Sequence, residues 1–275
     1  MKVLISVDLE GISGIVHPAE TNPDRYDYER GRALMTAEAN AVIAGVLDAE
    51  PDAVVWVADA HGTFRNILPE DLDRRAHLVR GKPRPLGMLA GLDEHTDAVL
   101  FVGYHARAGA GPAVLAHTIS DAILDVRVAG RSVGEIGLNV AMAGHLDAPV
   151  VLLSGDDTAC TEFSKLVPSA VTVAVKQTLG QAAAVALHPQ EARERLRHAA
   201  ADAIARRASI PPATMVGPLD VEVDLYGPYM VDLATLVPGV TRVGGGRTVA
   251  FHAADVAEAY RLVQLLVQLA SIKPG

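Results

Sequence analysis

Two short stretches near the start of the chain carry side chains of the kinds that bind metal ions. Asp8 and Glu10 follow one apolar run, and Asp59 and His61 follow another. Residues two apart in an extended chain point to the same side, so we expect Asp8 to project with Glu10 and Asp59 with His61. Carboxylate oxygen and imidazole nitrogen are ligands that Zn²⁺ accepts. The pattern therefore predicts a divalent-metal site.

A third apolar run, residues 98–102, leads to His105. Open α/β sheets bind their ligands beyond the carboxyl ends of their strands. If the three runs are neighbouring parallel strands, His105 joins Asp8, Glu10 and His61 at one edge of a sheet. A single Asp at a strand end is more often a turn former, so the joint pattern, rather than any one residue, indicates a metalloenzyme.

Strand-like and helix-like segments alternate along the chain as far as about residue 208. Such alternation predicts an α/β fold with a mainly parallel sheet flanked by helices. We assign residues 1–210 to this α/β metal-binding catalytic domain. Residues 211–275 follow a Pro-containing break and are assigned to a smaller C-terminal α+β portion. Residues 118–128 alternate in polarity, which predicts one continuous strand.

The composition argues against several classes of partner. The net charge is −9 and the chain shows no basic stripe, so we expect no nucleic-acid partner. No apolar run approaches the roughly 18 residues of a membrane span, so we expect no membrane association. The single cysteine, Cys160, can form no internal disulfide, which suits a reducing compartment. We therefore expect a cytoplasmic protein.

Several longer motifs resemble those of the zinc-dependent D-aminopeptidases of the dipeptide-transport-protein family. They agree with the family in order and spacing over about the first 180 residues. The motifs are Ser6-Val7-Asp8-Leu9-Glu10-Gly11, Asp59-Ala60-His61-Gly62, Gly103-Tyr104-His105-Ala106, His117-Thr118 and Gly134-Glu135-Ile136-Gly137-Leu138-Asn139.

The resemblance implies a site, a cofactor and an assembly. It implies that two zinc ions per subunit are bound by Asp8, Glu10, His61, His105 and Glu135. Without it, Glu135 would be explained as an acid in the first turn of a helix, where it complements the helix dipole. The resemblance also implies a ring-shaped homo-oligomer, a decamer in the family.

The same resemblance implies that His117 is the catalytic histidine. The expected reaction is hydrolysis of the N-terminal peptide or amide bond of short peptides. The expected substrates are peptides of D-amino acids. Our hypothesis is that a metal-bound hydroxide attacks while His117 carries protons or stabilises the oxyanion. A nucleophilic role for His117 is the alternative. We expect Asp59 to orient His61 or a neighbour from behind the site, with direct ligation of the metal as the alternative. Lys176 follows a strand and is either a contact to a substrate carboxylate or a solvated lysine.

Two other functions remain open on the sequence. The chain could be a metal-holding accessory protein that binds or transports a small molecule, because a structural zinc site uses the same ligand types. It could also hydrolyse another amide or a phosphoester, although no phosphate-binding loop is present: Gly244 to Gly246 lack a following Lys and are expected to form a turn. The sequence does not decide between D and L substrates, nor whether Asp8 or Glu10 bridges the metals.

Overall fold

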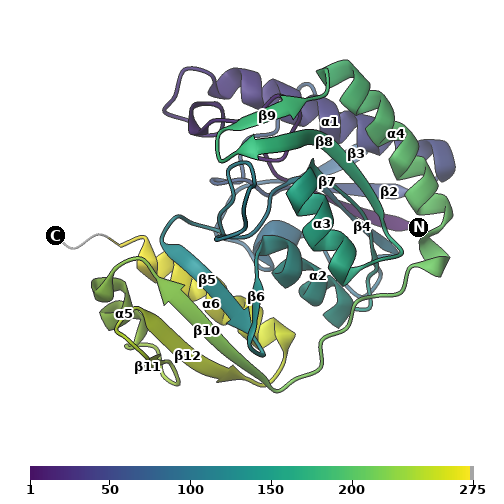
Figure 1. Cartoon of the computed structure of the whole chain (residues 1–275). Coiled ribbons are helices and arrows are strands. Elements are labelled where there is room, and N and C mark those ends of the chain that lie inside the picture. Colours follow the sequence, from purple (N-terminus) through teal and green to yellow (C-terminus); the bar gives the residue numbers. More distant parts are fainter. Residues whose placement is uncertain (273–275) are drawn as a thin grey trace.

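Two β-sheets organise the protein, one mainly parallel and one antiparallel (Figure 1). The computed structural model describes residues 1–272. The strands of the parallel sheet are β1 (Lys2–Val7), β2 (Val54–Asp59), β3 (Ala76–Val79), β4 (Ala98–Tyr104), β7 (Val150–Asp156), β8 (Val171–Gly180) and β9 (Ala183–Ala186). Their order is β3-β2-β1-β4-β7-β8-β9, and the edge strand β9 runs antiparallel to β8. The expected α/β fold with a mainly parallel sheet is confirmed.

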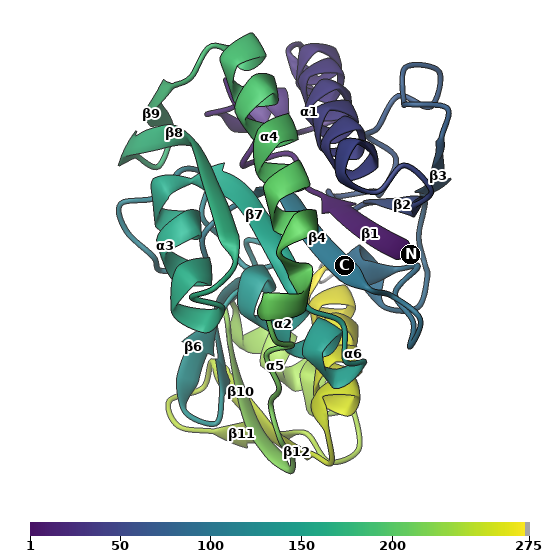
Figure 2. The same ribbon diagram turned by 90° about the vertical axis from the view of Figure 1, so that its right-hand side faces the viewer.

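Helices cover both faces of the parallel sheet. On one face, α1 (Tyr28–Ala49) packs against α4 (Pro189–Ala205), and both contact the sheet (Figures 1 and 2). On the other face lie α2 (Glu135–His145) and α3 (Asp157–Leu166). Strands covered on both faces need apolar side chains in both directions. The central strands β4 and β7 accordingly are buried along their whole length.

The antiparallel sheet has the strand order β11-β12-β10-β5-β6. Its strands are β5 (Ile123–Val128), β6 (Arg131–Val133), β10 (Leu219–Leu225), β11 (Thr241–Val243) and β12 (Thr248–Ala253). The helices α5 (Pro228–Ala234) and α6 (Val256–Ala270) pack on it, and α6 also contacts α2 (Figure 2). Since β5 and β6 come from the middle of the chain, the smaller portion is not confined to residues 211–275 as expected. It is completed by two strands that the sequence places between β4 and α2.

Three short 3₁₀ helices complete the described elements: η1 (Pro18–Glu20), η2 (Gly87–Leu89) and η3 (Arg207–Ser209). The expected strand over residues 118–128 starts later, at Ile123, after an isolated bridge between Thr118 and Ser120. Among residues 1–272, no helix is both long and apolar enough to cross a lipid bilayer.

Candidate metal centre

The acidic and imidazole side chains predicted from the sequence meet at one edge of the parallel sheet. Asp8 and Glu10 follow β1, His61 follows β2 and His105 follows β4. The strand β1 pairs in parallel with both β2 and β4, so the carboxyl ends of all three lie together. Asp8, Glu10 and His105 are buried. The predicted convergence of these side chains is therefore present in the structure.

Backbone carbonyl groups fix the tautomers of the two histidines. Nε2 of His61 lies 2.8 Å from the carbonyl oxygen of Thr21, and Nδ1 of His105 lies 3.0 Å from that of Ala106. Because a carbonyl oxygen only accepts, these two nitrogens must donate. In the neutral ring the other nitrogen carries the lone pair, and it faces the carboxylates. Metal-binding histidines are held in this way by a partner on the far nitrogen.

The distances within the cluster fit the space around bound ions. Asp8 lies between the two histidines, with Oδ1 3.3 Å from Nδ1 of His61 and Oδ2 3.4 Å from Nε2 of His105. Glu10 Oε2 is 3.0 Å from His61 Nδ1, and Glu135 Oε1 is 3.4 Å from His105 Nε2. Tetrahedral zinc with bonds of about 2.0–2.2 Å holds its ligand atoms roughly 3.3–3.6 Å apart. The donor atoms therefore fit zinc, and Asp8 is the carboxylate positioned between two ligand groups.

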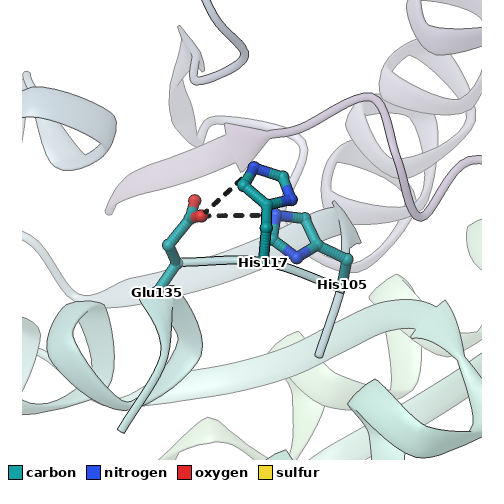
Figure 3. A group of neighbouring side chains, drawn as sticks. All are labelled: His105, His117 and Glu135. Carbon is teal, nitrogen blue, oxygen red and sulfur yellow. Dashed lines mark ion pairs between the residues drawn. The ribbon is translucent and has the colours of Figure 1, made fainter. Parts of the chain in front are cut away.

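Glu135 joins the cluster from the first residue of α2 (Figure 3). A carboxylate is favoured there because the helix dipole is positive at its N-terminus. The same Oε1 accepts a hydrogen bond of 2.6 Å from the backbone N–H of Ile119. Glu135 thus serves both as a candidate ligand and as an anchor for the loop that carries His117.

His117 lies beside the cluster, where a substrate can reach it. Its ring stacks on that of His105, with centroids 4.1 Å apart and planes at 11° (Figure 3). Nδ1 donates to the carbonyl oxygen of Leu115 at 2.8 Å, so Nε2, 3.8 Å from Glu135 Oε1, is the nitrogen with a lone pair. The side chain of His117 is 23% exposed, whereas that of His105 is 2% exposed. This exposure suits a residue that contacts substrate.

The electrostatics of the cluster favour positive charge. Burial lowers the pKa of His61 and His105, but the carboxylates of Glu10, Asp8 and Glu135 outweigh it and raise both pKa values well above the usual range. Burial, reinforced by the charge of Glu10, raises the pKa of Asp8. A buried group of carboxylates that draws protons onto its neighbours will also attract a divalent cation.

Lys176 supports the cluster from behind and does not face the cavity. It is 1% exposed, and its ammonium group donates to the backbone carbonyl oxygens of Glu10, Ile12 and Ile15. Both expectations for its environment are thereby corrected, because the side chain is neither solvated nor free to meet a substrate carboxylate. Its role in the structure is to hold the turn that carries Glu10.

Asp59 also acts through the backbone. Its carboxylate accepts hydrogen bonds from the backbone N–H groups of Asn66 and Ile67 and from the side-chain amide of Asn66. The same amide donates to the carbonyl oxygen of His61 at 2.6 Å. Asp59 therefore does not pair with the His61 ring, as the two-residue spacing had suggested. It holds the His61 turn through Asn66.

Two glycines allow the ligand-bearing segments to approach each other closely. Gly11 N donates to Gly103 O at 2.7 Å, and a Cβ atom on Gly11 would lie 2.1 Å from the carbonyl oxygen of Tyr104. A Cβ atom on Gly103, where φ is +69°, would lie 2.3 Å from the carbonyl oxygen of Asp8. Only glycine fits these positions. Because neither glycine has a side chain, the segment that carries Asp8 can pack close to the segment that carries His105.

The cluster borders a cavity of about 980 Å³, which lies at the upper end of the range for small-ligand sites, about 300–1,000 Å³. Asp8, Glu10, His61, His117 and Glu135 all line it, and α6 contributes a further wall. Structural zinc sites are closed by four protein ligands, whereas catalytic sites keep an open position. A candidate metal site on a cavity of this size favours catalysis over a purely structural metal.

Sequence reasoning missed several residues that shape the site. The carbonyl oxygens of Thr21 and Ala106 set the histidine tautomers, but a backbone group leaves no signal in the sequence. Asn66 was missed as well, although an Asn seven residues after Asp59 is a possible partner. Arg84 was also missed, and its guanidinium donates to the carbonyl oxygen of Asp59 at the end of β2.

Comparison with known proteins agrees with this geometry. The chain is 37% identical over 272 residues to the D-aminopeptidase of Bacillus subtilis (strain 168), with 98% of each protein covered. Its structure superimposes with a TM-score of 0.96, at 35% identity and full coverage of both chains, on the Zn-dependent D-aminopeptidase DppA from Bacillus subtilis, a self-compartmentalizing protease. The family model of the M55 peptidases, described as D-aminopeptidase, matches residues 1–265. This chain therefore belongs to the peptidase M55 family of D-aminopeptidases.

Proposed function

We propose that this protein is a zinc-dependent enzyme that removes the N-terminal residue from short peptides beginning with a D-amino acid. The observation that carries the proposal is the position of the Asp8 carboxylate, with one oxygen at His61 and the other at His105. The zinc dependence of the similar Bacillus subtilis enzyme and the family membership support it.

We further propose that two zinc ions bind per subunit. One ligand group consists of Glu10, His61 and one oxygen of Asp8, and the other consists of His105, Glu135 and the second oxygen of Asp8. Each group offers three protein donors, which leaves room for water or substrate. Asp8 is the residue that the two groups would share.

When bound, zinc would supply a Lewis acid for the scissile carbonyl and lower the pKa of water toward about 7. His117 supplies the proton chemistry of the reaction. Hydrolysis adds a hydroxyl group to the carbonyl carbon, and the released amine must gain the remaining proton of the water. Nε2 of His117 accepts that proton and returns it to the amine, while Leu115 holds Nδ1 protonated throughout. Glu135 lies close enough to stabilise the imidazolium that forms.

We also propose that the chain assembles into a closed homo-oligomer, a ring-shaped decamer, whose active sites face an enclosed space. The similar enzyme is a self-compartmentalizing protease. In this chain the parallel sheet ends at β9, where Val185 is 58% exposed, and β8 presents Leu179, which is 68% exposed. Uncovered strand edges with apolar side chains favour pairing with another chain. Light scattering coupled to size-exclusion chromatography measures the number of subunits, and a monomer would refute the assembly.

The decisive experiment measures zinc content and turnover together. Wild-type protein is expected to contain zinc and to hydrolyse D-alanyl-D-alanine faster than L-alanyl-L-alanine, and a chelator should abolish turnover reversibly. His117→Ala is expected to keep its zinc and lose turnover, whereas His95→Ala, an exposed control, should behave as wild type. Loss of zinc in His117→Ala would make His117 a ligand, and full activity would remove it from the mechanism.

A further inference from the structure

The cavity wall next to the metal cluster carries two cationic side chains around one aromatic ring. The Nζ atom of Lys82 lies 5.6 Å from the ring centroid of Phe64, and Cζ of Arg84 lies 4.1 Å from it. The backbone N–H of Phe64 donates to the carbonyl oxygen of His61 at 2.7 Å. The ring therefore belongs to the same turn as a metal-ligand candidate. Lys82, Phe64, Arg84 and His61 all line the cavity.

Arg84 is fixed in place, and among the described residues it forms no ion pair with a carboxylate. Its guanidinium donates to the carbonyl oxygens of Val79, Asp59 and Gly87, at 3.0, 2.6 and 2.8 Å. These bonds join the ends of β2 and β3 to the 3₁₀ helix η2. Arg84 thus holds the wall together and leaves a positive charge behind the Phe64 ring.

Lys82 is an exposed residue, and within residues 1–272 its ammonium group makes neither a hydrogen bond nor an ion pair. The ammonium group lies over the face of Phe64. Phe64 itself has φ of +58°, a left-handed conformation that bulky residues rarely adopt. Such strain persists where the surrounding structure holds a residue in a functional position. The aromatic face therefore supports an ammonium group whose donors remain free for a ligand in the cavity.

We propose that Lys82, backed by the charge of Arg84, binds the free α-carboxylate at the C-terminal end of the substrate. The inference rests on the proposed peptidase function and adds a substrate class to it: short peptides with an unblocked C-terminus. Such a peptide has its scissile bond at the N-terminal end, which must reach the metal-ligand candidates, and a negative charge at the other end. The cavity offers a place for each end, with the metal-ligand candidates on one wall and the free donors of Lys82 on the adjoining wall.

The test compares peptides with their C-terminal amides. The substrates are D-alanyl-D-alanine, tri-D-alanine and the corresponding amides, each assayed with zinc-loaded enzyme. If Lys82 forms a hydrogen-bonded charge pair with the α-carboxylate, the wild-type enzyme should prefer the free acid over the amide. The expected preference is about 10- to 100-fold in kcat/KM for the dipeptide, the tripeptide or both, mainly through KM. The preference should fall as salt is added.

Three variants test whether Lys82 causes the preference for the free acid over the amide. Lys82→Met keeps the length of the side chain and removes the charge, so the ratio of acid to amide should fall toward one. Lys82→Arg should retain the preference. Lys165→Met removes an exposed lysine from α3, away from the cavity, and should keep the wild-type ratio.

Equal hydrolysis of acid and amide by wild type at both lengths, or an unchanged ratio in Lys82→Met, would overturn the proposal. Either result would leave the peptidase function standing. Wild-type enzyme that cleaves none of the four substrates would instead refute the proposed function itself. The two failures are therefore distinguishable in one set of assays.

Discussion

Glu38 is a buried carboxyl group whose ionisation makes a testable contribution to stability. It lies in α1 and is 2% exposed. Oε1 accepts a hydrogen bond of 2.8 Å from the backbone N–H of Ser13, in the loop that follows Glu10. Oε2 has no hydrogen-bond partner among the described residues. An ionised carboxylate in this position is therefore only half satisfied.

Burial raises the pKa of Glu38 to about 7, although the Ser13 N–H and the charge of Lys176 act in the opposite direction. In the unfolded chain the same group titrates near 4.5. Between these values the folded state binds more protons than the unfolded state, so stability falls as the pH rises. The contribution is complete below pH 4.5 and lost above pH 7. Integrated from pH 5 to pH 8, the loss is roughly 2 to 3 kcal/mol.

Glu38→Gln should remove this pH dependence, because glutamine resembles the protonated acid and keeps an acceptor for Ser13. Relative to wild type, the free energy of unfolding of the variant is expected to rise by roughly 2 to 3 kcal/mol between pH 5 and pH 8. Urea unfolding of zinc-saturated protein at one protein concentration measures the difference, and zinc binding contributes equally to both proteins. Glu29→Gln, which removes an exposed carboxyl group from the same helix, is the control. A constant difference between wild type and Glu38→Gln across this pH range would refute the reasoning.

The supports of the metal cluster give three further predictions. Lys176→Met leaves the backbone carbonyl groups behind the cluster unpaired, and zinc affinity should fall about 10- to 100-fold in a competition assay with a chelating dye; unchanged affinity would contradict the supporting role. Gly11→Ala places a Cβ atom against the carbonyl oxygen of Tyr104. The free energy of unfolding should therefore fall by about 1–3 kcal/mol, and the zinc content should fall as well. Asn66→Ala removes the side-chain amide that donates to the buried Asp59 carboxylate and to the carbonyl oxygen of His61, and a destabilisation of about 1–3 kcal/mol is expected in thermal or urea unfolding. A stability equal to wild type would show that water replaces the amide.

The convergence of Asp8, His61 and His105 was predictable because each of these candidate ligands follows a locally recognisable apolar strand. Asp8, His61 and His105 could be placed at strand ends without knowing the fold. One further assumption, that the strands are parallel neighbours, then brought them to one edge of a sheet. Glu135 was different, because an acid at the start of a helix is fully explained by the helix dipole. Its place in the cluster came from the family resemblance and not from its local pattern.

The second sheet was harder to predict because its pairing is not local. The strand β5 pairs with β10, and more than 90 residues separate partners such as Arg127 and Glu222. An alternating polarity pattern indicates that one face of a strand is buried, but it does not indicate which other strand lies beside it. For this reason residues 123–133 were assigned to the larger domain, although they complete the sheet of the smaller portion.

Lys176 shows most clearly how a local rule failed. In β8, Val173 and Val175 are buried and Ala174 is exposed, so strict alternation would place Lys176 on the exposed side. The pairing of β8 with β7 shifts after Gly155, however, and Lys176 lies opposite Asp156. Such an irregularity turns the next side chain toward the interior. The ammonium group then reaches the carbonyl oxygens behind Glu10. One shift in strand register therefore turns a residue that the sequence assigns to solvent or substrate into a support of the turn that carries Glu10.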